Sequence, residues 1–127
     1  MSRKKDLFKL ARINAVAQDV SQRVCRFLAT AGVQAETRTK QAGTNTIYAS
    51  ILVFQPNGEQ LRGCGATIRI SDHRQKPADR WVNFSRPARR FYGVWCFTDP
   101  QRLDRKARRI GENILKHIGR WQEGGEA

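Results

Sequence analysis

The chain has 127 residues, and its 24 lysines and arginines against 11 acidic residues give a formal net charge of +13. Its length suits one domain with one sizeable core, and its 39% hydrophobic content argues against a disordered tail. No apolar run approaches about 18 residues, and the basic N-terminus lacks the apolar stretch of a signal peptide. We therefore expect a single domain over residues 1–123, a flexible tail over 124–127 and no membrane contact.

The charge is the most informative part of the composition, with a pI near 10.9. A compact domain with this much like charge repels itself unless something compensates. A polyanion is the natural partner, with nucleic acid first and an acidic protein surface second.

Residues 5–31 read as one long helix, because apolar residues recur at alternating intervals of three and four positions. The stripe consists of Leu10, Ile13, Ala17, Val20, Val24, Phe27 and Ala31. Gly32 follows as a stop signal. The stripe suits a core face, and it would also suit the seam of a homodimer.

The region between 34 and 97 contains runs of β-branched and aromatic residues that predict strands. The candidates are 34–40, 46–54, 61–70, 81–85 and 91–97. Pro56, Asn57 and Gly58 predict a hairpin turn between the second and third of these. Gly63 and Gly65 indicate a bulge or a close backbone approach.

Residues 100–122 predict a second helix, with Thr98 or Asp99 as its cap and Pro100 in its first turn. Its apolar stripe consists of Leu103, Ala107, Ile110, Ile114, Ile118 and Trp121. The opposite side is basic, with Arg102, Arg105, Lys106, Arg109, Lys116 and Arg120.

Strands in a run with a helix at each end predict an α+β fold, in the order α-β(4-5)-α. We expect an antiparallel sheet of about four to five strands with both helices packed on one face.

The three cysteines, Cys25, Cys64 and Cys96, are far apart in the sequence and each has apolar neighbours. No CxxC pair occurs, so neither a zinc ribbon nor a redox motif is indicated. We expect buried, reduced thiols, which is typical of a cytoplasmic protein.

Motifs for catalysis are nearly absent, since the chain has no phosphate-binding loop, nucleophile elbow or metalloprotease motif. The sequence therefore predicts a non-enzyme with no metal or cofactor. A minimal metal-dependent nuclease is the alternative, and its only support is Asp72, His73 and Asp79.

A short string at the end of the third predicted strand reads Arg69-Ile70-Ser71-Asp72-His73. The string follows the predicted hairpin, and in this position it resembles a short element of small proteins and accessory domains of phages, plasmids and other bacterial mobile elements. The resemblance covers about five residues and implies provenance, namely a mobile-element protein, with no catalytic role. Ser71 and Asp72 are also good turn residues at the end of a strand.

Arginine alternates with aromatic residues between positions 80 and 95, and further basic residues lie on the first predicted helix. Arginine suits bidentate contact with phosphate, and aromatic rings stack on unpaired bases. The candidate contacts are Lys5, Lys9, Arg12, Arg69, Arg74, Lys76, Arg80, Trp81, Arg86, Arg89, Arg90 and Tyr92.

These observations predict a non-catalytic nucleic-acid-binding protein that contacts mainly the phosphate backbone. No helix-turn-helix or ribonucleoprotein signature is present, so the choice between DNA and RNA stays open. The alternative is a phage or plasmid accessory protein of the anti-defence (anti-CRISPR-like) type that binds a protein partner.

Overall fold

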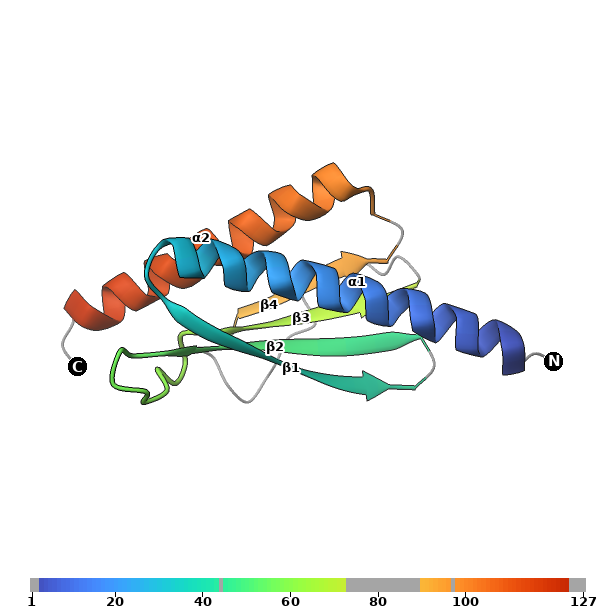
Figure 1. Cartoon of the computed structure of the whole chain (residues 1–127), viewed down its shortest axis with the longest axis horizontal. Helices are drawn as coiled ribbons and strands as arrows, with labels where there is room; N and C mark the ends of the chain where they lie inside the picture. The colour runs from blue at the N-terminus through green and yellow to red at the C-terminus, as the bar shows by residue number, and fades with distance from the viewer. Residues whose placement is uncertain (1–2, 44, 73–89, 97, 124–127) are drawn as a thin grey trace.

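A computed structural model of the chain describes residues 3–43, 45–72, 90–96 and 98–123 (Figure 1). The elements follow the order helix, four strands, helix. They are α1 (Arg3–Thr30), β1 (Gln34–Ala42), β2 (Thr46–Phe54), β3 (Ala66–Ser71), β4 (Arg90–Trp95) and α2 (Pro100–Glu123). The α+β class and both predicted helices are confirmed. The predicted strand at 81–85 lies outside the described residues.

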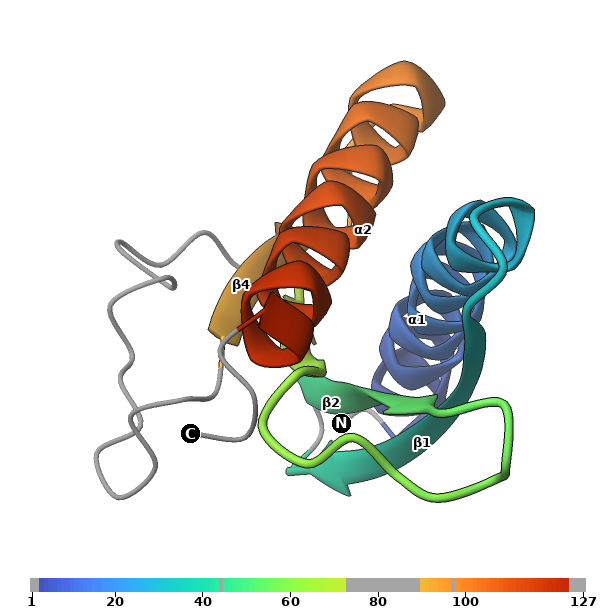
Figure 2. The same cartoon turned by 90° about the vertical axis from the view of Figure 1, so that its left-hand side faces the viewer.

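The four strands form one sheet in the order β1-β2-β3-β4, and both helices lie on the same face of it (Figures 1 and 2). Figure 2 shows α1 over the β1–β2 side of the sheet and α2 over the β4 side. Neither helix covers the other face.

The strand pairings are antiparallel except for the last one. β1 pairs with β2 and β2 with β3 in antiparallel register, whereas β3 and β4 run parallel. A parallel pair needs a connection of about a dozen residues or more. The stretch 72–89 is long enough for this return, and the local sequence pattern did not predict it.

The apolar stripe of α1 packs into the core, so it is not left as a free dimer seam. Ile13, Ala17, Val20 and Val24 are fully buried, as expected. Leu28 completes the stripe in place of Ala31, which is exposed beyond the end of the helix. Gly32, with φ at +80°, ends α1 in a turn in which the Val33 amide donates to the Leu28 carbonyl at 2.9 Å.

Helix α2 begins as its sequence predicts. Asp99 Oδ1 accepts a hydrogen bond from the Arg102 amide at 3.0 Å, which identifies Asp99 as the N-cap. Pro100 occupies the first helical position. The inward side chains are Leu103, Ala107, Ile110, Ile114 and Ile118, all of them buried.

The connection between β2 and β3 is longer than a two-residue hairpin. A turn at 55–59 contains Gly58, with φ at +92°, and the Leu61 amide then donates to the Val53 carbonyl at 2.9 Å. The chain bulges before β3 starts at Ala66. Gly65 lies against the Ile51 carbonyl of β2, so the predicted close backbone approach is confirmed.

Candidate nucleic-acid interface

The structure describes only part of the predicted arginine-rich surface. Six of the candidate contacts lie outside the described residues: Arg74, Lys76, Arg80, Trp81, Arg86 and Arg89. For Lys5 and Arg90 only the backbone is described, in α1 and β4 respectively. These eight assignments stay predictions.

Lys9 and Arg12 lie near the carboxyl ends of the parallel strands. Lys9 Nζ is 3.7 Å from Asp72 Oδ2, just after β3, and its side chain is 54% exposed. Burial raises the pKa of the Cys96 thiol, just after β4; the charge of Asp72 raises it further and that of Arg12 lowers it. Asp72, which belongs to the Arg69–His73 string, therefore lies beside the N-terminal half of α1.

Arg69 is not presented at the surface as predicted. It lies on the sheet face opposite the helices, but its residue exposure is only 6%. β3 is an inner strand, and Arg69 pairs in register with Tyr48 of β2 and Gly93 of β4. The alternation along the strand gave the correct face of the sheet, but it did not indicate that Arg69 is buried there.

Tyr92 also differs from its predicted role as an exposed stacking ring. It is partly buried against the hydrophobic core, and its hydroxyl accepts a hydrogen bond from Asn113 Nδ2 at 2.9 Å. This bond joins β4 to α2. Tyr92 therefore anchors the second helix to the edge of the sheet.

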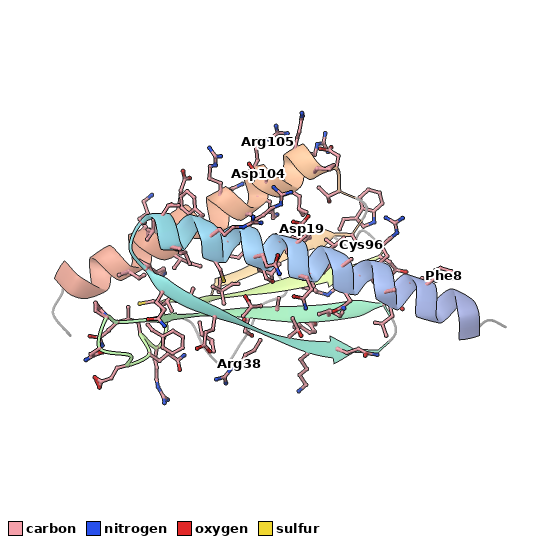
Figure 3. All side chains as sticks on the ribbon, in the orientation of Figure 1. Phe8, Asp19, Arg38, Cys96, Asp104 and Arg105 are labelled. Atoms are coloured by element: carbon pink, nitrogen blue, oxygen red, sulfur yellow. The ribbon has the colours of Figure 1, made fainter. Side chains whose placement is uncertain are left out.

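The outward side of α2 is a row of exposed cations that was not among the predicted contacts. The row consists of Arg102, Arg105, Arg109 and Lys116, with Glu112 as the acidic residue among them. We call these four cations the α2 basic row. Arg102 lies 3.7 Å from Asp99, whereas Arg105, Arg109 and Lys116 have no ion pair among the described residues. Figure 3 shows Arg105 pointing away from the sheet.

The angular count along residues 100–122 already placed these cations on one side. A single basic helix face is usually only a solvated face, so the pattern by itself did not mark a site. The structure adds that α2 packs with its apolar side against the core, so the basic side is exposed to solvent along the described part of the helix.

Beside the α2 basic row, α1 and α2 enclose a groove of about 300 Å³ that is lined by Arg23, Arg26 and Arg108 among others. Arg23 donates to Asp19 at 2.9 Å and to Asp104 at 3.0 Å. Those two hydrogen bonds raise the pKa of the Arg23 guanidinium. Arg23 therefore ties the two helices together, and the carboxylates make this groove a poorer anion site than the row.

No protein-family model, curated protein or solved structure matches the chain. Among the described residues, no three histidine, cysteine or acidic side chains gather as metal ligands. None of the described helical segments is long and apolar enough to cross a membrane.

Proposed function

We propose that this protein binds nucleic acid without catalysis, mainly through contacts between its basic side chains and the phosphate backbone. The observation that carries the proposal is the α2 basic row, exposed along one side of a helix in a chain of net charge +13. Arg105, Arg109 and Lys116 have no ion pair among the described residues, so none has to be broken when they contact phosphate, and each contact releases condensed counterions.

The dimensions of the row suit a phosphate backbone. At a rise of about 1.5 Å per residue, Arg102 and Lys116 lie about 21 Å apart along the helix axis. A strand of B-form DNA carries one charge per about 3.4 Å of axis, so the row spans roughly six phosphates. The four cations of the row would contact those phosphates that face the helix. Such contacts do not read sequence, and we propose binding with little sequence preference.

A pair of matched double variants tests where binding occurs. Arg105→Ala with Arg109→Ala removes two charges from the α2 basic row. Arg38→Ala with Lys40→Ala removes two exposed charges from β1. Arg105 and Arg38 point to opposite sides of the molecule (Figure 3). Both double variants lower the net charge equally, so a difference between them reports location.

The measurement is fluorescence anisotropy with a labelled duplex and a labelled single strand over a range of salt concentrations. The α2 double variant should flatten the log–log salt slope by about 1.4–1.8 units, because each lost phosphate contact removes about 0.7–0.9. The β1 double variant should change the slope by much less. If the α2 double variant keeps the slope of the natural chain, the α2 basic row is not part of the interface.

A protein partner is the alternative outcome. If the folded protein binds neither probe, but retains one protein from a nuclease-treated bacterial lysate, the accessory-factor hypothesis replaces this proposal.

A further inference from the structure

The N-terminal half of α1 presents an exposed aromatic ring that the core does not use. Phe8 is 77% exposed, and it is the large hydrophobic residue that stands out from the described surface. By the helical count it lies opposite the buried stripe of Ile13, Ala17 and Val24. A single exposed apolar residue is ordinary, so the residues around Phe8 determine whether it indicates a binding site.

Those neighbours form a hollow lined by both apolar and charged side chains. Ala11, Ala15 and Val16 supply small apolar side chains, and Lys9, Arg12 and Asp72 supply two positive charges and one negative charge. The hollow has a volume of about 610 Å³, within the range of roughly 300–1,000 Å³ that is common for small-ligand sites. Figure 3 shows Phe8 on the helix side of the molecule, the side to which Arg105 also points.

We propose that Phe8 is a stacking platform for an unpaired base, and that Lys9 and Arg12 bind the phosphates on either side of that base. This inference rests on the proposed function and specifies its substrate class as single-stranded nucleic acid. Phe8 and Arg12 are four residues apart, so their side chains are neighbours on the helix surface. A base on the ring therefore brings its own phosphate within reach of the guanidinium.

Lys9 is available for this role although it contacts Asp72. The pair is long, at 3.7 Å, and the lysine side chain is about half exposed. The half-exposed ammonium can therefore reach a phosphate while it stays beside the carboxylate. The carboxylate then lies at the edge of the hollow, where its side chain is 12% exposed.

Charge complementarity favours nucleic acid over a protein as the occupant. The aromatic anchor of a protein interface is usually surrounded by near-neutral contacts that exclude water. Here two cations and one carboxylate, Asp72, line the hollow beside the ring, and the whole chain has a net charge of +13. Basic side chains with an aromatic ring between them are typical of surfaces that bind single strands.

Three substitutions at Phe8 separate stacking from simple apolar contact. Phe8→Ala removes the ring, Phe8→Leu keeps an apolar side chain without a π-face, and Phe8→Trp enlarges the π-face. The ring is exposed, so all three variants should fold, which circular dichroism checks. The probes are a labelled thymidine oligonucleotide of about 20 nucleotides and a duplex of the same length, both longer than a typical single-strand site.

We expect Phe8→Ala and Phe8→Leu to weaken binding of the single strand by about ten- to a hundredfold. Phe8→Trp should bind it at least as tightly as the natural chain. Duplex binding should change by less than about threefold in all three variants, because paired bases are already stacked on each other. Lys9→Ala and Arg12→Ala should each flatten the single-strand salt slope by about 0.7.

Three results would overturn the inference and leave the proposed function standing. One is unchanged single-strand binding in Phe8→Ala. Another is a Phe8→Leu variant that binds like the natural chain, which would indicate apolar contact without stacking. The third is a dimer that Phe8→Ala converts to a monomer in sedimentation, which would make a second copy the occupant. If the natural chain binds neither probe, both proposals fail together.

Discussion

Gly65 lies immediately before β3, where the chain passes closer to β2 than a side chain permits. A Cβ at this position would overlap the backbone carbonyl of Ile51. A backbone carbonyl in the middle of a sheet cannot swing aside as a flexible side chain can. The glycine is therefore required by space, and it sets how the bulged connection joins the two strands.

The change Gly65→Ala should lower the free energy of unfolding by about 1–3 kcal/mol, as overpacking of a core does. The change in the urea midpoint measures this loss of stability. An unchanged slope of the unfolding transition would show that the substitution does not alter the unfolded state. A midpoint equal to that of the natural chain would show that the two strands can separate enough to admit the methyl group.

The thiols also belong to the residue scale. Cys64 and Cys96 are buried, and burial raises the pKa of both. Cys25 is only partly buried, with its Sγ 3.3 Å from Thr37 Oγ1. All three are free and two are buried, as the sequence predicted, whereas Cys25 is less buried than predicted.

We expect a thiol reagent to label Cys25 before Cys64 and Cys96 in the native protein, and all three in denaturant. Because the folded pKa of the two buried thiols is raised, their contribution to stability is complete below the pKa of an unfolded cysteine, about 8.5. That contribution is lost as the pH rises through the folded values. Mass spectrometry of the labelled protein checks the order, and early labelling of Cys64 or Cys96 would contradict it.

At the scale of elements, the contact between the helices depends on Gly111. A Cβ at Gly111 of α2 would meet the ring of Phe27 on α1, whereas a Cβ at Gly119 meets nothing within 4 Å. Both positions are inside the same helix. Only a Cβ at Gly111 would meet a side chain of α1, so Gly119 is a matched control for Gly111.

Gly119→Ala should raise the free energy of unfolding by about 0.5–1 kcal/mol, which is the ordinary helix-propensity gain. Gly111→Ala should gain less or lose, because the Phe27 ring has to move. In a Phe27→Ala background the two glycine substitutions should become equivalent, which a double-mutant cycle of urea midpoints measures. Equal effects in the natural background would show that the helices do not depend on this contact.

Local patterns predicted the helices well because capping and apolar periodicity depend on residues that are close together in the sequence. Asp99, Pro100 and Gly32 mark boundaries through their own side chains or backbone freedom. The choice of Leu28 over Ala31 at the end of the stripe depends on where α1 stops over the sheet. The parallel β3–β4 pair depends on contacts between distant segments, which no local pattern encodes.

The candidate site divides in the same way. Composition predicted the basic surface, and the angular count placed Arg105 and Arg109 on one side of α2. Neither could show that Arg69 is buried on an inner strand or that the Tyr92 hydroxyl accepts a hydrogen bond from Asn113. Phe8 was missed because its position opposite the apolar stripe signals only exposure, and its hollow requires the packed structure.

At the scale of the whole molecule, basic side chains lie on several surfaces, so the distribution of binding among them is a question for mutagenesis. The sequence predicts a contribution from Arg86, Arg89 and Arg90. Replacing all three with alanine should flatten the salt slope by about 2–3 units if each meets a phosphate. Circular dichroism should show an unchanged fold. A slope within error of the natural chain would exclude these three residues from the interface.

The most direct test of the proposed polyanion-binding surface is the salt dependence of binding by the natural chain. Fluorescence anisotropy with a labelled single strand and a labelled duplex measures it. We expect micromolar or tighter binding at low salt and a log–log slope of about −3 to −5, from roughly four to six phosphate contacts. A folded protein that changes the anisotropy of neither probe at low salt would contradict the proposal.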